Sequence, residues 1–262
     1  MGYNRKNIDW AGPFCGGGGR WVGKGDWTMK KQLQSGAEGG AQVPRRRWGK
    51  QQTVLFSLSV LVVLAVIFGA LDYYSLLPKR SYTAADFGIE TLHSETDRNG
   101  NGVDDFSDIL EGARKAVEEN PIYDNSYAAG GYPEAGRGAC TDVVWRALAH
   151  AGYDLKGMVD ADIALEPDAY PGAEDANIDF RRVKNLAVFF SRHCAVLTLD
   201  PYQVADWQPG DIVTFSPSHI AIVSDKRNRD GVPYIIHQDG QPQKEEDALT
   251  HRTITGHYRF IV

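Results

Sequence analysis

The amino-acid sequence predicts an α+β domain that follows a single membrane-spanning helix. Three observations carry this prediction. A long stretch without charge lies in the first third of the chain, apolar residues recur at helical spacing through the middle, and the pattern changes to short strands in the C-terminal third. Because the helical segments come first and short turns connect the strands, we expect helices packed on a small antiparallel sheet.

The uncharged stretch at 53–71 is nineteen residues long, just enough to cross a hydrocarbon core of about 30 Å. A buried core helix is the first alternative, but such a helix is seldom apolar on every face for five turns. A cleaved signal peptide is the second, and its apolar core is usually shorter, about 7–15 residues. We therefore expect an uncleaved anchor, a juxtamembrane linker at 72–90 and a folded domain at 91–262.

Charge is distributed unevenly along the chain. Residues 1–52 carry ten Lys and Arg against three acidic residues, whereas the remainder carries eighteen against thirty-one. Arg45, Arg46, Arg47 and Lys50 lie just before the anchor, so the positive-inside rule places the N-terminus in the cytoplasm and the domain outside the cell. The Gly-rich, aperiodic tail at 1–52 is expected to be disordered. The acidic distal part argues against nucleic acid as a partner.

Residues 97–108 have the spacing of a twelve-residue calcium loop. Side-chain oxygens stand at positions 1, 3, 5, 9 and 12, a glycine stands at position 6, and position 7 offers its carbonyl. Asp in place of the EF-hand Glu at position 12 makes the loop resemble the dockerin type. The alternative is an Asx-rich turn that caps the following helix. The expected ligands of a structural calcium ion are Asp97, Asn99, Asn101, Val103, Asp105 and Asp108.

Three segments after this loop have the apolar spacing of helices. The first has one apolar face formed by Phe106, Ile109, Leu110, Ala113 and Val117, and Pro121 ends it. The second begins at Cys140 and ends at Gly152, and the third, at 183–190, is less regular. Residues 155–178 are rich in Asp and Pro, so we expect them to be irregular.

The C-terminal third contains four predicted strands, at 212–215, 219–224, 233–237 and 253–262. His219 opens one strand and His237 closes the next, so antiparallel pairing would bring the two imidazoles together. One could then act as a base and the other could hold its orientation. The alternative is two strand residues satisfied by local hydrogen bonds. Five histidines in polar or loop contexts are expected to be solvated: His93, His150, His193, His251 and His257.

Cys140 stands at a predicted helix N-terminus after a Gly-rich approach. The helix dipole and the free N–H groups there favour a thiolate, which a cysteine nucleophile requires. The alternative is a buried structural thiol. Cys194 is expected to be a small buried hydrophobe, but a disulfide between Cys194 and Cys140 would remove the nucleophile.

The motifs follow one another in a recognisable order. They are Gly-x-Cys-Thr-Asp at 138–142, Pro-Gly-Asp-Ile-Val-x-Phe at 209–215, Ser-His-Ile-x-Ile-Val at 218–223 and Ile-Ile-His at 235–237. This order resembles the NlpC-type papain-like cell-wall cysteine hydrolases. More narrowly, residues 106–262 resemble the YijF-like family, whose function is unassigned.

The resemblance implies a papain-like fold with Cys140, His219 and His237 as the catalytic residues. It also implies metal-independent hydrolysis of an amide bond in a peptidoglycan stem peptide. Tyr132 is expected to contact substrate or to donate a hydrogen bond to the oxyanion, and Asp142 either binds a substrate amine or caps its helix. One alternative is an inactive, calcium-stabilised module for cell-wall binding or scaffolding. Another is an acyltransferase or lipid hydrolase of the same fold, because a fold does not determine a substrate.

Overall fold

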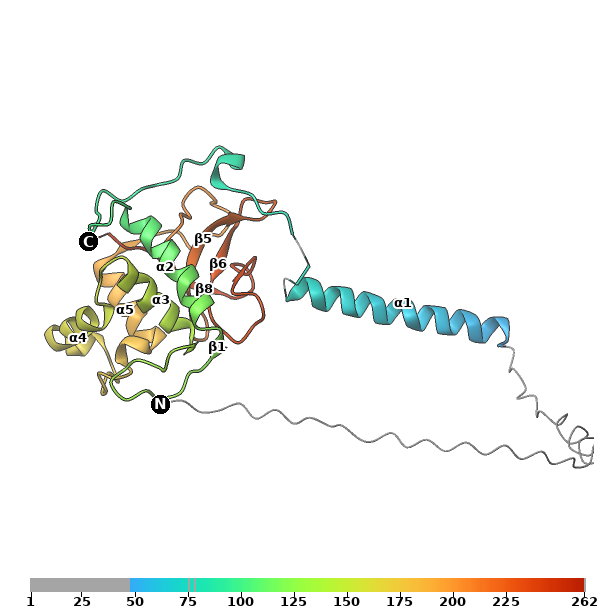
Figure 1. Ribbon diagram of the computed structural model, residues 1–262, viewed down its shortest axis with the longest axis horizontal. Helices are drawn as coiled ribbons and strands as arrows, with labels where there is room; N and C mark the ends of the chain where they lie inside the picture. Colours follow the sequence, from blue (N-terminus) through green and yellow to red (C-terminus); the bar gives the residue numbers. More distant parts are fainter. Residues whose placement is uncertain (1–47, 75, 78, 262) are drawn as a thin grey trace, which may run out of the picture. The chain divides into compact units, whose positions relative to one another are not determined.

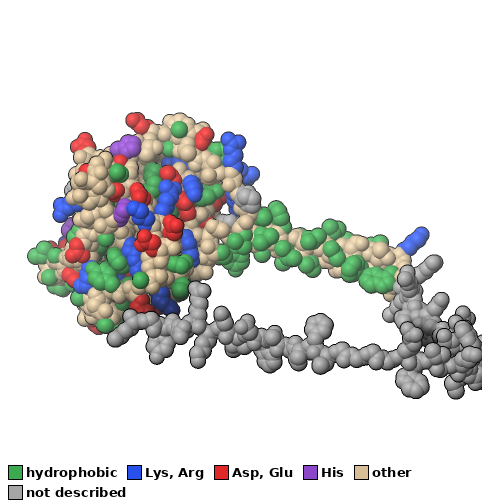
Figure 2. Space-filling view, in the orientation of Figure 1, with side chains coloured by type: hydrophobic (Ala, Val, Ile, Leu, Met, Phe, Trp, Pro, Cys, Tyr) green, Lys and Arg blue, Asp and Glu red, His purple; other side chains and the backbone are tan. Residues whose placement is uncertain are grey.

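The computed structural model describes residues 48–74, 76, 77 and 79–261. Helix α1 (Lys50–Tyr73) contains the predicted anchor at 53–71 and extends it at both ends. None of its residues is buried within the protein, and Figure 2 shows apolar side chains along its length. The helix is therefore long and apolar enough to cross a membrane. Most of the predicted tail at 1–52 lies outside the described residues.

The three predicted helices of the domain are present. They are α2 (Asp105–Glu119), α3 (Cys140–His150) and α5 (Val183–His193). The side chain of Asp104 caps α2 by accepting a hydrogen bond from the Ser107 N–H. These helices lie on one side of the sheet, where their apolar faces form a common core with it (Figure 1).

The prediction that residues 155–178 are irregular is wrong, because the segment contains α4 (Leu155–Leu165). Asp154 caps this helix by accepting from the Gly157 N–H, and Leu155 and Val159 bury one face of it. Two short 3₁₀ helices follow, η2 (Pro167–Ala169) and η3 (Asp179–Arg181).

The sheet is antiparallel throughout and has the strand order β3-β8-β4-β5-β6-β7. All four predicted strands are present, and the last of them pairs with β4. Two short strands at the sheet edges were not predicted. The strands are β3 (Ala195–Val196), β4 (Ile212–Phe215), β5 (His219–Arg227), β6 (Pro233–Ile236), β7 (Glu245–Glu246) and β8 (Ile254–Arg259). A separate parallel pair joins β1 (Ile122–Tyr123) to β2 (Arg137–Gly138).

Alternate residues of the central strands enter two different apolar clusters, as the period of two in a strand requires. Ile220 and Ile222 of β5 pack with the helices, whereas Ala221 and Val223 pack on the opposite face around Trp207. His219 has the same parity as Ala221, so it belongs to the face away from the helices.

The predicted linker at 72–90 is only partly a linker, because residues 82–92 are docked on the domain. Tyr82 and Arg227 exchange both backbone hydrogen bonds, at 2.9 and 2.7 Å. The side-chain amide of Gln208 donates to the Glu90 carbonyl and its oxygen accepts from the Leu92 N–H. We call residues 82–92 the docked segment. It also contains the 3₁₀ helix η1 (Ala84–Phe87). The folded domain therefore begins about nine residues earlier than predicted.

Candidate active site

Cys140 is the first residue of α3, and the extended residue Ala139 connects it to strand β2. Gly138 lies two residues earlier in β2. A Cβ atom at Gly138 would lie 2.7 Å from Nη1 of Arg146 and 3.0 Å from Cβ of Asp142. A larger residue at Gly138 would therefore have to displace the end of the Arg146 side chain and press against Asp142.

Asp142 fixes the beginning of the same helix from inside the protein. One of its oxygens accepts from the Ala139 N–H at 2.7 Å, and the other accepts from the Trp145 indole at 2.8 Å. Arg181 binds both oxygens, at 2.8 and 2.9 Å. Because the Asp142 side chain is fully buried and its oxygens are occupied, it caps α3 in this arrangement and does not face a substrate.

The two predicted strand histidines are in contact. Nε2 of His219 lies 2.7 Å from Nδ1 of His237, and both side chains are buried. Nε2 of His237 in turn lies 3.0 Å from Oε1 of Glu246, which is also buried. Glu246 was not predicted from the sequence. It belongs to the two-residue strand β7 (Glu245–Glu246). The sequence signal that could have found it is the pair of glutamates that follows His237.

The Cys140 thiol lies beside the start of β5. Backbone N–H groups of Ile220 and Thr141 point at its sulfur, and Ile220 follows His219 directly in the chain. In the described part of the chain, no hydrogen bond joins the Cys140 thiol to His219. In ligand-free enzymes such contacts are often long and tighten only when substrate binds.

The expectation of a stabilised thiolate is wrong for this arrangement. Burial raises the pKa of the Cys140 thiol to about 11, and the two backbone N–H groups oppose this shift without reversing it. Burial also lowers the pKa of His219 to about 3, with the His237 and Arg252 charges acting in the same direction. Both shifts favour the neutral forms, of the thiol and of the imidazole, over a thiolate–imidazolium pair.

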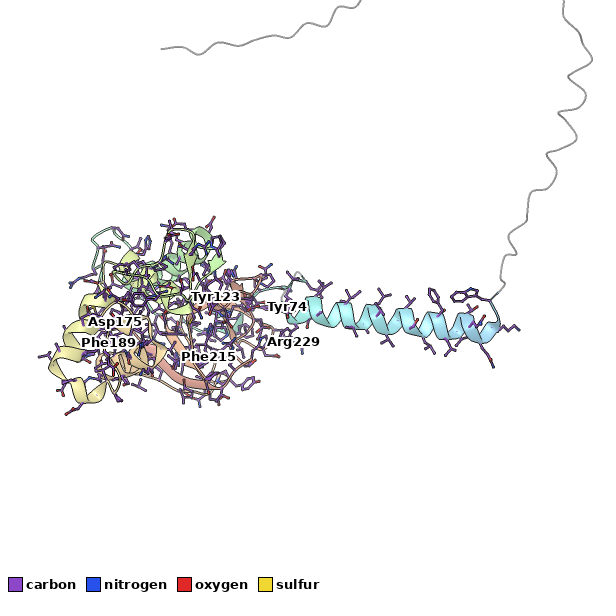
Figure 3. The ribbon with its side chains drawn as sticks, turned by 90° about the horizontal axis from the view of Figure 1, so that it is seen from below. Tyr74, Tyr123, Asp175, Phe189, Phe215 and Arg229 are labelled. Carbon is purple, nitrogen blue, oxygen red and sulfur yellow. The ribbon has the colours of Figure 1, made fainter. Side chains whose placement is uncertain are left out.

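A hollow in the domain surface adjoins the histidine pair. Phe215, labelled in Figure 3, forms part of its wall, and Asp239 and Arg252 form an ion pair at it. Burial raises the pKa of Tyr123, also labelled there, and the charges of Cys140 and Asp239 act in the same direction. Tyr132 is exposed and packs against the rings of Trp145 and Phe180 instead.

The calcium-type loop brings together most of the predicted ligands. The side-chain amides of Asn99 and Asn101 donate to Asp108, and Asp97 accepts from the N–H groups of Gly100, Asn101 and Gly102. Asp105 does not join them. It is buried and accepts from the hydroxyls of Thr96 and Tyr153, both at 2.5 Å. The Val103 carbonyl has no hydrogen-bond partner in the described part of the chain.

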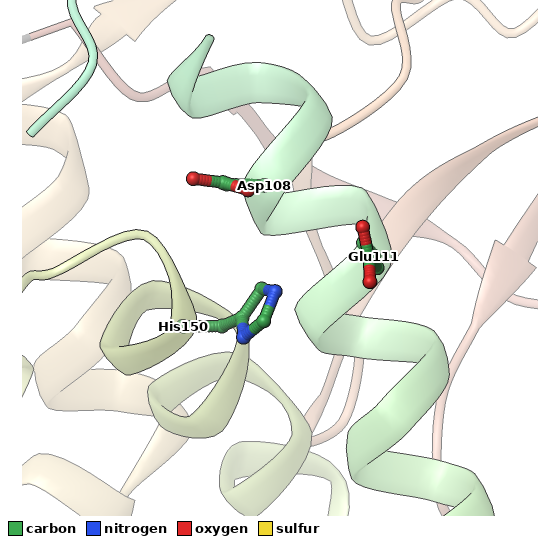
Figure 4. A group of neighbouring side chains, drawn as sticks. All are labelled: Asp108, Glu111 and His150. Carbon is green, nitrogen blue, oxygen red and sulfur yellow. The ribbon is translucent and has the colours of Figure 1, made fainter. Parts of the chain in front are cut away.

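A second group of metal-ligand type lies next to this loop, formed by Asp108, Glu111 and His150 (Figure 4). Protein groups already satisfy it. Lys115 pairs with Glu111 at 2.7 Å and lies 3.4 Å from Nε2 of His150. Asp108 accepts from the two asparagine amides described above. We therefore do not treat these three residues together as a metal site.

His257 is one of the five histidines expected to be solvated. That prediction is wrong for His257, because it is fully buried. Its ring stacks on Trp207, with centroids 3.7 Å apart, and Nε2 lies 2.9 Å from Oδ2 of Asp211. Arg259 binds both oxygens of the same carboxylate. Asp211 therefore holds β8 in the sheet. Cys194 and Cys140 are both free thiols.

The protein is therefore a mixed helix-and-sheet domain with a cysteine at the start of a helix and two histidines in contact. Residues 110–260 match the family described as "Domain of unknown function (DUF1287)", which covers more than half of the chain, so the protein belongs to that family. The chain is 39% identical over 167 residues to the "Uncharacterized protein YijF" of Escherichia coli (strain K12). That match covers 59% of this chain and 81% of the relative, and confirms the predicted YijF-like family. No solved structure matches the chain.

Proposed function

We propose that this protein is a membrane-anchored cysteine hydrolase that cleaves amide bonds. The observation that carries the proposal is the buried hydrogen bond of 2.7 Å between His219 and His237, one residue from the N–H group that points at the Cys140 sulfur. A histidine whose ring is held by a second side chain, next in the chain to a residue whose N–H faces a thiol, supports a role in covalent catalysis. It supports a papain-like, NlpC-type interpretation of the fold.

The reaction follows from the protonation states. Since the Cys140 thiol is neutral, His219 removes its proton as the sulfur attacks the amide carbonyl. The positive end of the α3 helix dipole, at the N-terminus of that helix, stabilises the oxyanion. The protonated His219 then donates to the leaving amine, which leaves an acyl group on Cys140. Finally, His219 activates a water molecule that hydrolyses this thioester and releases the acid.

The substrate we propose is a stem peptide of peptidoglycan, on the strength of the NlpC-type motif order. The positive residues before α1 support an N-terminus in the cytoplasm and a catalytic domain outside the cell. Tyr132 can contact a substrate because its ring is exposed. The buried Asp142 cannot do so without breaking its bonds to Arg181.

This function is tested by incubating the full chain in detergent micelles with purified peptidoglycan, calcium and a reductant. We expect mass spectrometry to detect fragments with a new amine and a new carboxyl end. Cys140→Ala should lower their rate of formation by at least about 10⁴-fold, because removal of a nucleophile costs about that much or more.

Cys194→Ala is the matched control, since Cys194 is a free thiol that the reaction does not use. Equal fragment yields from the wild type and Cys140→Ala, or no fragments from either, would count against the hydrolase. The second outcome would favour the alternative of an inactive wall-binding or scaffolding module.

We also propose that the loop at 97–108 binds a structural calcium ion. The sequence spacing and the convergence of Asn99, Asn101 and Asp108 support this. Rotation of the two asparagine side chains would turn their oxygens toward the ion. Asp105 would stay outside the ligand set unless it left Tyr153.

Calcium at about a hundred times its dissociation constant is expected to stabilise the domain by about 2.7 kcal/mol. That corresponds to a rise in Tm of roughly 5–10 °C for a domain of this size. Asp97→Ala should abolish the rise, whereas Asp160→Ala, a change outside the loop, should retain it. Differential scanning calorimetry with and without a chelator measures both. A rise that persists in Asp97→Ala would show that calcium binds elsewhere.

A further inference from the structure

The histidine pair does not end at His237, because Glu246 continues it. The three side chains are joined by two hydrogen bonds, 2.7 and 3.0 Å long, and none of the three residues is more than 6% exposed. A buried carboxylate that contacts one nitrogen of a histidine determines which of the two ring nitrogens carries the hydrogen.

The proton positions follow from the carboxylate outward. Ionised Glu246 can only accept, so Nε2 of His237 must carry a hydrogen. In a neutral imidazole the other nitrogen is then an acceptor, so Nδ1 of His237 accepts from Nε2–H of His219. This leaves Nδ1 of His219 without a hydrogen. One carboxylate therefore determines which nitrogen of the distant imidazole can take a proton.

The register of the sheet explains why Glu246 alone can do this. Glu246 lies opposite Ile235 in the pairing of β6 with β7, so it shares a face with Ile235 and with His237. Glu245 lies opposite Ile236 and points to the other face, where it binds Arg114, Ser224 and Lys226.

Three other charged groups interact electrostatically with the residues of this hydrogen-bonded series. Lys244 acts on Glu246, whereas Asp239 and Arg252 act on His219 with opposite signs.

We propose that Glu246 is the positioning residue of the site: through His237 it keeps Nδ1 of His219 unprotonated and opposes the charge that His219 gains from Cys140. This role rests on the hydrolase proposed above. When the thiol proton moves to Nδ1, the Nε2–H of His219 stays in place, and no proton needs to pass along the chain. The negative charge of Glu246 then stabilises the new imidazolium at a distance of two hydrogen bonds.

Two variants and one matched control test this role in the full chain in micelles. Glu246→Leu removes both the acceptor and the charge, whereas Glu246→Gln keeps an acceptor oxygen and removes the charge. Glu245→Gln makes the same chemical change one residue away, on the opposite face. The ¹⁵N NMR spectra of histidine-labelled protein report the tautomers of His219 and His237, and difference spectra of His219→Gln and His237→Gln assign the signals.

We expect Glu246→Leu to change the tautomers of both histidines, and Glu246→Gln and Glu245→Gln to leave them unchanged. Turnover should fall about 10–100-fold in Glu246→Leu and less in Glu246→Gln. Loss of the charge in Glu246→Gln should also lower the pKa of His219, so the acidic limb of the pH profile of turnover should move to lower pH.

The NMR experiment needs no substrate, so the two proposals can fail separately. If the tautomers change as expected in a chain without hydrolase activity, Glu246 holds its role and the hydrolase assignment fails. Wild-type tautomers in Glu246→Leu overturn the role of Glu246 even if activity depends on Cys140. Should Glu246→Leu not fold, an unshifted pH profile in Glu246→Gln, or altered tautomers in that variant, would overturn it instead.

Discussion

Asp142→Ala is expected to lower the free energy of unfolding by about 3–5 kcal/mol, the usual result of removing one partner from a buried ion pair. The change leaves the guanidinium of Arg181 buried without a counter-ion, since the Arg181 side chain is only 6% exposed. It also leaves the Ala139 N–H without its acceptor at the start of α3. Denaturation by urea, followed by tryptophan fluorescence, measures the effect.

Asp160→Ala provides the comparison for this prediction. Asp160 pairs with Lys156 on the partly exposed surface of α4, where such a pair contributes less than about 1 kcal/mol. A cost for Asp142→Ala that does not exceed that of Asp160→Ala would show that Arg181 and Trp145 hold the helix start without the carboxylate.

Cys140 is expected to react slowly with iodoacetamide at pH 7 in the substrate-free protein. A pKa of about 11 in place of 9.0 reduces the thiolate fraction about a hundredfold. The more basic thiolate is intrinsically more nucleophilic, which restores roughly tenfold. We therefore expect alkylation at least about tenfold slower than for a free cysteine. Because the neutral thiol is favoured below the raised pKa, the rate should climb steadily between pH 7 and pH 11.

The sequence contains two cysteines besides Cys140, namely Cys15 and Cys194. The measurement uses a chain with Cys15→Ala and Cys194→Ala, so that only Cys140 can be alkylated. His219→Ala should leave the rate at pH 7 nearly unchanged, since a neutral imidazole does not stabilise the thiolate. A rate that is independent of pH between 6 and 8 and collapses in His219→Ala would reveal a preformed ion pair, contrary to the structure.

The helices with a regular apolar face could be predicted from the sequence because local signals determine them. Asp104 caps α2, and the apolar face of α3 follows directly from the spacing of its residues. Helix α4 could not be predicted in the same way. The carboxylate of Asp162 is buried in it, and three residues outside the helix bind that carboxylate: Tyr170, Arg192 and His193. Such compensation is invisible in a local window.

In the candidate site, too, some features could be predicted from local sequence and others depend on the tertiary structure. The pairing of His219 with His237 could be predicted because adjacent antiparallel strands place the start of one near the end of the next. Glu246 could not, because a two-residue strand has no periodicity of its own and depends on β6 for its pairing. The pKa of Cys140 was predicted in the wrong direction because burial is a property of the tertiary fold, which the helix N-terminus alone does not reveal.

The docked segment limits how far the domain can travel from α1. Nine peptide units connect Tyr73, the last residue of α1, to Tyr82, where the backbone joins Arg227. Even fully extended, they span only about 30 Å. With α1 in a membrane, the domain would search a thin shell above the bilayer, and its effective concentration would be high for substrates within that shell and negligible beyond it. Chain length would then select substrates by their height above the membrane as well as by their chemistry.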